Sequence, residues 1–158
     1  MIMNTKIPYL ELAILLAEEG INKGHGPFGA VIVKDDEIIA KAVNSVTLKN
    51  DPTAHAEVLA IREAAYKLRK PDLDGCEIYT SCEPCPMCLG AIYWAGIKKV
   101  IYAADRVDAA DAGFNDKFIY EEISQEPIDR KLEFININHP KARKLFDKWK
   151  KYEGKILY

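Results

Sequence analysis

The amino-acid sequence predicts an α/β protein in three α/β/α layers, with helices on both faces of one mixed five-stranded sheet. Three observations favour this class. Segments with helical spacing alternate with short apolar segments, which is typical of strands covered by helices. A short polar turn joins the first two strands as a hairpin, which makes the sheet mixed rather than purely parallel. The chain has 158 residues, close to the usual length of one domain, so we expect a single domain.

Each element in the first half of the chain has a recognisable start or stop. Apolar residues recur every three or four positions up to a break at Gly24–Pro27. The polar turn Lys34–Glu37 separates the first two strands, and Asn50–Thr53 contain residues that commonly begin helices. The elements expected here are a helix at 8–22, strands at 28–33 and 38–44, and a helix at 54–68.

Turns and prolines also separate the elements of the second half. Pro71 and Gly75 end the second long helix, and a turn rich in proline and cysteine precedes the third. The elements expected here are strands at 77–80, 99–103 and 132–138, and helices at 86–95, at 117–123 and after Pro140. The three strands bring the expected total to five.

Composition and charge exclude several classes of protein. Hydrophobic residues make up 49% and charged residues 29%, so the chain can bury a core and is not expected to be disordered or fibrous. No apolar run reaches the roughly 18 residues that a membrane span needs, and the N-terminus lacks a signal-peptide pattern. We therefore expect a cytoplasmic protein. A net charge of −2 gives no general case for binding nucleic acid or membranes.

Two short motifs predict a metal site. Cys85 and Cys88 are three residues apart at the start of a predicted helix, so both thiols can point to one side, and a helix N-terminus favours the thiolate. His55 begins another predicted helix. One imidazole and two thiolates suit tetrahedral zinc, and three protein ligands leave a fourth position open, as in catalytic sites. Glu57 is then the expected carboxylate that moves protons.

Each motif taken alone has other interpretations. His55 and Glu57 would face opposite sides in the middle of a helix, so they share a site only if His55 lies at the helix mouth. A Cys-x-x-Cys pair also occurs as a redox pair or as half of a structural zinc site, which Cys82 could complete. In that case the His-x-Glu pair would be a coincidence. Because both motifs open predicted helices, catalytic zinc is the favoured interpretation.

With these motifs the sequence resembles the zinc-dependent cytidine deaminase superfamily, whose H-x-E … P-C-x-x-C signature matches His55–Glu57 and Pro84–Cys88. Similarity to the bacterial guanine deaminases within it lies in Asn50–Glu57, Tyr79–Ala95 and Ala112–Tyr120, and more loosely in the chain from Gly26 to Tyr158. The resemblance implies a cytidine-deaminase-like fold and one zinc ion per chain. It also implies hydrolytic deamination of guanine to xanthine and ammonia by a zinc-activated water, with Glu57 as the proton shuttle.

The polar contacts to a purine follow from the chemistry of the base and from the resemblance. Guanine presents N1–H and its 2-amino group as neighbouring donors that a carboxylate accepts, whereas adenine presents a bare acceptor there. Asp116 matches the family position for this contact, although alone it could instead cap the helix that follows. Asn44 matches the family's polar contact to the purine, although an asparagine at a strand end also forms turns. Ala56, between the two motif residues, belongs to the same expected set.

Aromatic residues complete the expected substrate-binding set. Phe28 would stack on the base or pack as ordinary core. Trp94 lies on the same predicted helix as Cys88, and it could either line the pocket or pack in the core. In the guanine deaminases that the sequence resembles, the C-terminal segment crosses to the partner subunit and its last tyrosine closes that subunit's active site. Tyr158 is the matching residue, so the resemblance implies a homodimer that exchanges residues from about 139 to 158.

The remaining histidines and cysteines are expected to have no part in the site. His25 and His139 are expected in solvated loops, and Cys76 and Cys82 are expected as buried thiols.

Charge is distributed unevenly along the chain. Residues 141–155 contain seven basic and two acidic residues, a net +5, whereas residues 105–133 contain nine acidic and four basic, a net −5. A basic helix could bind tRNA, as in the related tRNA adenosine deaminases, but the preferred interpretation is that this helix presents a solvated face. The sequence departs from those enzymes after the zinc motif. The alternative substrates are guanosine or another aminated heterocycle, and adenosine in tRNA. The alternative to an enzyme is a zinc-stabilised nucleic-acid-binding module.

Overall fold

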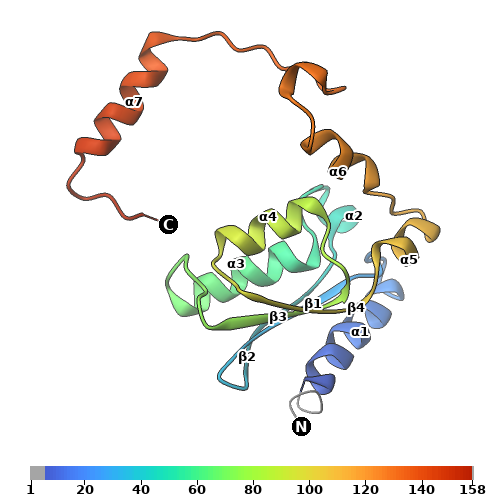
Figure 1. Cartoon of the computed structure of the whole chain (residues 1–158). Helices are drawn as coiled ribbons and strands as arrows, with labels where there is room; N and C mark the ends of the chain where they lie inside the picture. The colour runs from blue at the N-terminus through green and yellow to red at the C-terminus, as the bar shows by residue number, and fades with distance from the viewer. Residues whose placement is uncertain (1–5, 158) are drawn as a thin grey trace. The chain divides into compact units, whose positions relative to one another are not determined.

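A mixed sheet of four strands organises the first part of the chain. The strands are β1 (Gly29–Lys34), β2 (Glu37–Val43), β3 (Cys76–Cys82) and β4 (Lys99–Ala104). Their order is β2-β1-β3-β4, in which β1 pairs antiparallel with β2 and β3, and β3 pairs parallel with β4 (Figure 1). The computed structural model describes residues 6–157 and divides the chain into two units, Met1–Asp116 and Lys117–Tyr158.

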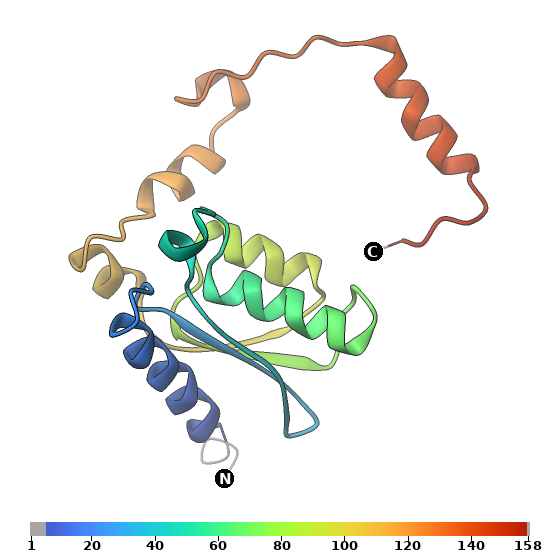
Figure 2. The ribbon, with the colours of Figure 1, turned by 180° about the vertical axis from the view of Figure 1, so that it is seen from behind.

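Helices cover both faces of this sheet, which confirms the expected three layers. Helix α1 (Ile7–Ile21) lies on one face, and α3 (Ala56–Leu68) and α4 (Pro86–Trp94) lie on the other (Figures 1 and 2). Two short helices were not expected: α2 (Val46–Lys49) follows β2, and α5 (Arg106–Asp111) follows β4. The ends of the long elements lie within a few residues of their expected positions.

Strand β1 lies at the centre of the core because it is buried on both faces. Its alternate residues point to opposite sides, so Ile32 joins the cluster under α3 and α4, whereas Val31 joins the cluster under α1. A continuous apolar strand is the expected pattern for such a position. Helix α1 approaches β1 closely at Gly29, where an added Cβ would lie 2.1 Å from the carbonyl oxygen of Ala13.

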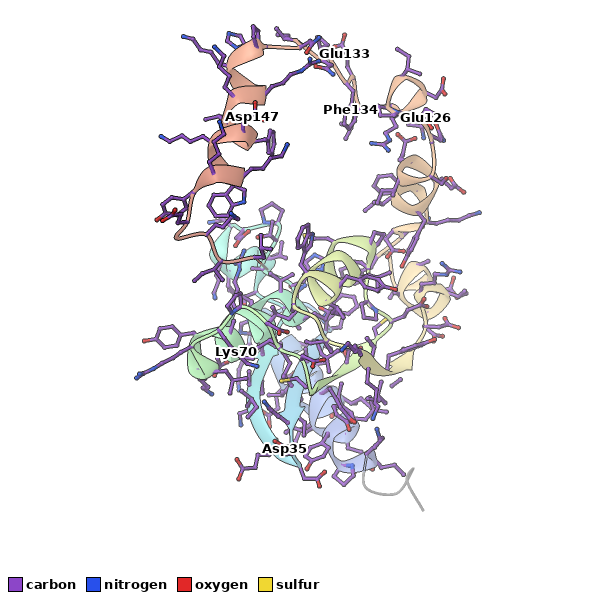
Figure 3. The ribbon with its side chains drawn as sticks, turned by 60° about the vertical axis from the view of Figure 1, so that its left-hand side comes forward. Asp35, Lys70, Glu126, Glu133, Phe134 and Asp147 are labelled. Atoms are coloured by element: carbon purple, nitrogen blue, oxygen red, sulfur yellow. The ribbon has the colours of Figure 1, made fainter. Side chains whose placement is uncertain are left out.

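The second unit consists of helices joined by irregular segments. These are α6 (Lys117–Ile123), a 3-10 turn at Pro127–Asp129 and α7 (Pro140–Lys151). None of the residues 117–157 is buried. Figure 3 shows side chains of this unit, Phe134 and Asp147 among them, projecting from the ribbon. The helices at 117–123 and after Pro140 confirm the sequence prediction.

The expected fifth strand at residues 132–138 is wrong. Within the described part of the chain these residues have no regular secondary structure, and the sheet has four strands. A strand exists only through hydrogen bonds to a neighbouring strand, so an apolar pattern without a partner leaves the segment irregular.

No described helix is long and apolar enough to cross a membrane.

Candidate active site

His55 occupies the mouth of α3, which is the position its sequence motif requires. Its backbone is extended (φ −69°, ψ 152°), and the helix begins at Ala56. The turn before it is held by Asp51, whose carboxylate accepts hydrogen bonds from the backbone N–H and the hydroxyl of Thr53 at 2.8 and 2.7 Å. Because His55 is the N-cap, it and Glu57 in the first turn can both reach one site. Glu57 is 7% exposed.

Cys85 is placed in the same way at the mouth of α4. Its backbone is extended (φ −65°, ψ 168°), and Pro86 begins the helix, as prolines commonly do at the first helical position. Cys88 follows in the first turn and is fully buried. The two thiols therefore face the histidine from a second helix N-terminus.

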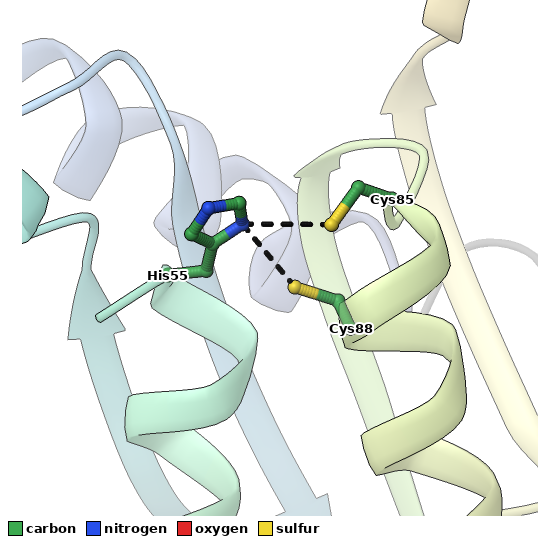
Figure 4. A group of neighbouring side chains, drawn as sticks. All are labelled: His55, Cys85 and Cys88. Atoms are coloured by element: carbon green, nitrogen blue, oxygen red, sulfur yellow. Dashed lines mark hydrogen bonds between the residues drawn. The ribbon is translucent and has the colours of Figure 1, made fainter. Parts of the chain in front are cut away.

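The three side chains form a cluster with the separations of a tetrahedral metal site (Figure 4). His55 Nδ1 lies 3.6 Å from Cys85 Sγ and 3.5 Å from Cys88 Sγ. Tetrahedral zinc, with Zn–N and Zn–S bonds of about 2.0 and 2.3 Å, places its N and S ligands about 3.5 Å apart. Among the described residues this is the group of metal-ligating side chains close enough to hold an ion. The donor set and its spacing fit zinc.

Burial and charge set the protonation of the cluster. Hydrogen bonds from Cys88 and His55 lower the pKa of Cys85 to about 4, against the opposing effect of burial, so Cys85 is a thiolate at neutral pH. The hydrogen bond with this thiolate raises the pKa of His55. Burial, and then the charge of Cys85, raise the pKa of Glu57. The site thus contains a metal-binding thiolate beside a buried carboxyl group.

Three of the predicted substrate contacts lie in the first unit near this cluster. Burial and the charge of Cys85 raise the pKa of Asp116, so its carboxyl group is within electrostatic reach of the cluster. Asn44 is 8% exposed, and the backbone N–H of Ser45 donates to Ala54, just before His55, at 2.9 Å. Ala56 is fully buried at the start of α3.

Phe28 packs as a core residue, and its stacking on the base stays a prediction. It packs against the core cluster under α3 and α4, and its ring meets that of Phe114 edge to face, with centroids 4.9 Å apart. Phe114 lies two residues before Asp116, so this contact joins the expected stacking residue to the loop of the expected carboxylate.

Trp94 lies away from the cluster, at the far end of its helix. Trp94 ends α4, roughly 13 Å along the helix axis from Cys85, and it is 73% exposed, so it does not pack in the core. Tyr158 lies outside the described residues. Cys76 and Cys82 are buried, as expected, and the Cys82 thiol donates to the carbonyl of Asp105 at 3.5 Å rather than joining the cluster.

The expectation that His25 is a solvated loop residue is wrong. His25 is partly buried, and its Nδ1 lies 2.9 Å from the carbonyl oxygen of Asn44. The signal available in the sequence is a histidine between two glycines, directly before the Pro27–Phe28 pair. His139 is exposed, as expected, and caps α7 by accepting the backbone N–H of Lys141 at 3.2 Å.

Comparison with known proteins identifies the family. Residues 3–104 match the model of the cytidine and deoxycytidylate deaminase zinc-binding region. The chain belongs to this family. Guanine deaminase of Bacillus subtilis (strain 168) is 54% identical over 151 residues, which are 95% of this chain and 97% of that protein. The tRNA-specific adenosine deaminase of Aquifex aeolicus is 50% identical over 96 residues, 61% of this chain and 64% of that protein.

Solved structures of this deaminase family agree with the fold. The X-ray structure of guanine deaminase from B. subtilis matches 96% of this chain and 97% of its own, with a TM-score of 0.93 and 53% identity. Guanine deaminase from Nitrosomonas europaea matches 68% of this chain and 63% of its own, with a TM-score of 0.64 and 34% identity. His55, Cys85 and Cys88 are therefore the candidate ligands of a zinc-binding deaminase domain.

Proposed function

We propose that this protein is a guanine deaminase, which hydrolyses guanine to xanthine and ammonia in the cytoplasm. The extent of similarity carries this proposal. The match to B. subtilis guanine deaminase spans 95% of the chain, whereas the match to the A. aeolicus tRNA deaminase spans 61%. The zinc motif is common to both kinds of enzyme, so the part of the chain beyond it favours guanine.

The roles of the protein's own residues follow from their positions. His55, Cys85 and Cys88 would hold zinc, and the zinc would supply a water of lowered pKa. Glu57, buried next to Cys88, would take a proton from the water and deliver protons to the ring nitrogen beside C2 and to the departing 2-amino group. Water and guanine enter, and xanthine and ammonia leave, so the reaction balances.

Two polar side chains would contact the purine, and one of them would distinguish guanine from adenine. Asp116 would accept N1–H and the 2-amino group, and adenine, which lacks a donor at N1, would leave this carboxylate facing an acceptor. Asn44 uses its Oδ1 to accept the backbone N–H of Val46 at 3.2 Å. Its amide N–H groups have no hydrogen-bond partner within the described chain, so they are available to a purine acceptor.

A substrate panel tests the proposed activity. We expect zinc-loaded protein to convert guanine to xanthine, followed by its ultraviolet absorbance, and to act far more slowly on guanosine, adenine, cytosine and a tRNA anticodon stem-loop. A zinc chelator should stop the reaction. Absence of guanine turnover by the zinc-loaded protein would reject the proposal, and preferred turnover of another substrate would replace guanine with it.

We also propose that the enzyme is a homodimer that exchanges its C-terminal segment, residues 139–158. Helix α7 exposes Leu145 and Phe146 by 68% and 69%, an apolar surface that a soluble chain commonly covers with a partner. The net +5 of residues 141–155 complements the net −5 of residues 105–133. A second copy of the chain offers both the acidic segment and the exposed Trp94. Tyr158 would then close the partner's pocket.

Complementation between two impaired variants tests the exchange directly. We expect Glu57→Gln and Tyr158→Ala each to be weakly active alone. When the two are co-expressed, half of the dimers are mixed, and one of their two sites unites an intact Glu57 with an intact Tyr158, which restores about one quarter of the wild-type activity. If the C-terminal segment instead closes the site of its own subunit, no dimer contains an intact site. The absence of restored activity would therefore contradict the exchange.

A further inference from the structure

We propose that His25 is a positioning residue for purine recognition, because its imidazole holds the backbone of Asn44 and thereby aims the Asn44 amide. The inference rests on the proposed function, in which that amide contacts the substrate. It gives His25 a role that the zinc site and the reaction do not require.

The hydrogen bond shows which nitrogen of the imidazole carries a hydrogen. Nδ1 of His25 lies 2.9 Å from the carbonyl oxygen of Asn44. A carbonyl only accepts, so Nδ1 carries the hydrogen. The hydroxyl of Ser45 lies 3.3 Å from the same nitrogen and donates its own hydrogen to the carbonyl of Val43 at 3.0 Å, so it is free to accept as well. One N–H donor thus ties the loop before β1 to the end of β2.

The neighbouring residue Gly26 leaves room for the Asn44 side chain. A Cβ at position 26 would lie 2.9 Å from Asn44 Oδ1 and 3.0 Å from its Cγ. The amide is therefore confined between the bare backbone of Gly26 and the N–H of Val46, which Oδ1 accepts at 3.2 Å. His25 holds the main chain of Asn44, and Gly26 and Val46 together confine its side chain.

This arrangement connects Asn44 to the other parts of the site. The backbone N–H of Asn44 donates to the carbonyl of Phe28, the expected stacking residue, at 2.9 Å. The next residue, Ser45, is bonded through its backbone N–H to Ala54, which directly precedes His55. A displacement of Asn44 would therefore misalign the amide relative to both the stacked base and the zinc ligand.

Two substitutions of similar size separate the donor from simple packing. His25→Asn places an amide N–H near the position of Nδ1, whereas His25→Gln extends its amide one bond farther and loses that donor position. We expect His25→Gln and His25→Ala to lower kcat/KM for guanine about 10-fold, mainly through a higher KM, and His25→Asn to restore it. Thr47→Val is the matched control, because the Thr47 hydroxyl donates to the carbonyl of Gly24 at 3.1 Å and so joins the same two segments by a hydrogen bond that does not involve Asn44. Thr47→Val should leave KM unchanged.

A double-mutant cycle with Asn44→Ala shows whether His25 acts through Asn44. We expect His25→Gln to cause no further loss of kcat/KM once the Asn44 amide is absent, since coupled residues have non-additive effects. An equal loss in both backgrounds would overturn the inference, because it would show that His25 acts by packing or through another residue.

A measurement on the protein without substrate keeps this inference separate from the proposed function. In labelled wild-type and variant proteins, we expect the NMR signals of the Asn44 side-chain amide to shift in His25→Gln and to stay in place in Thr47→Val. If wild type fails to deaminate guanine, the proposed function fails and the Asn44 signals still test the positioning. If wild type deaminates guanine while His25→Gln matches it in KM and in the Asn44 signals, the positioning role is overturned.

Discussion

Residues 6–116 and residues 117–157 use apolar side chains in opposite ways. In the first part Val31 and Ile32 are fully buried on the two faces of one strand, and a core lies on each side of the sheet. In the second part no residue is buried, and Leu145 and Phe146 on α7 are more than two-thirds exposed. About 40 residues are too few to supply a core of their own without a partner or cross-links. Residues 117–157 therefore contain no core that would stabilise this part by itself.

The chemistry divides along the same line. The zinc-ligand cluster and Glu57 lie in the part that has its own core, where helix mouths hold them against buried strands. Rigid support of this kind is what a catalytic arrangement needs, because small displacements cost large factors in rate. Residues 117–157, as the structure describes them, contain no ligand of the cluster. In the exchange proposed above, this part would contribute to assembly and pocket closure rather than to the reaction itself.

Loss of a zinc ligand is expected to have the largest effect. Replacing residues that only support metal ligands commonly costs about 10–100-fold, so Cys88→Ala, which removes a ligand, should cost more and leave almost no bound zinc. Zinc content by atomic absorption and guanine turnover measure both effects. The control is Cys82→Ala, a buried thiol outside the cluster, which should keep its zinc. Loss of zinc from Cys82→Ala would instead indicate the three-cysteine structural site.

Removal of the proton shuttle should be nearly as severe but should leave the metal in place. Glu57→Gln keeps the size of the side chain and loses proton transfer, so we expect full zinc content and a kcat lower by at least about 10²-fold. Glu63→Gln on the same helix is the control, because the Glu63 side chain is partly exposed and, among the described residues, forms an ion pair with Lys67 away from the cluster. A Glu57→Gln enzyme of near-native rate would remove this residue from the mechanism.

Sequence alone predicted the parts of the site that depend on local signals. Asn50–Thr53 and Pro86 mark two helix starts, and they place His55 and Cys85 at helix mouths, where the structure has them. Helix α5 also has such a signal, a capping box in which Asp105 and Asp108 bond each other's backbone, which could have revealed it. Such local signals can be recognised in a sequence because the interacting residues are only three or four positions apart.

The features that sequence missed depend on distant partners. A glycine–histidine–glycine segment indicates a loop, and only the pairing of β1 with β2 brings His25 to a carbonyl 19 residues away. The apolar pattern at 132–138 is compatible with a strand. A strand also needs a neighbouring strand to pair with, and the pattern does not show whether one is present. The contact of His25 and the absence of a strand at 132–138 could therefore not be predicted from neighbouring residues alone.

Glycine substitutions in the two parts test the contrast in packing. At Gly29 an added methyl group would lie 2.1 Å from the carbonyl oxygen of Ala13, so α1 must move, and we expect Gly29→Ala to lower the free energy of unfolding by about 1–3 kcal/mol. At Gly154 the nearest atom is the movable hydroxyl of Tyr152, so Gly154→Ala should stay within about 0.5 kcal/mol. Urea unfolding followed by fluorescence measures both. Equal losses would show that the tail is packed as tightly as the sheet.

Charge pairs give the smallest and most specific contrast. Burial alone would raise the pKa of Glu77 on β3, but hydrogen bonds from Lys99, Tyr79 and Lys6 outweigh it and lower that pKa to about 2, from an ordinary value of 4.5. Tyr79 donates at 2.6 Å and Lys6 at 3.0 Å. In the tail, Lys150 and Asp147 are 3.8 Å apart and both more than 60% exposed. Exposed pairs of that kind contribute little to stability.

The lowered pKa of Glu77 determines the pH range of its contribution. A carboxylate favoured in the folded state stabilises the protein fully above its unfolded pKa, near 4.5, and loses that contribution as the pH falls toward the folded value of about 2. We expect Glu77→Gln to lose about 1 kcal/mol at neutral pH and to converge with wild type as the pH falls through this range. Asp147→Asn should follow wild type throughout. Because Glu77 and Asp147 lie outside the zinc-ligand cluster, zinc release at low pH should affect all three proteins alike, and the difference between their urea unfolding curves then isolates each carboxylate. A Glu77→Gln protein that stays less stable than wild type by the same amount at every pH would show that Glu77 acts through packing rather than through its charge.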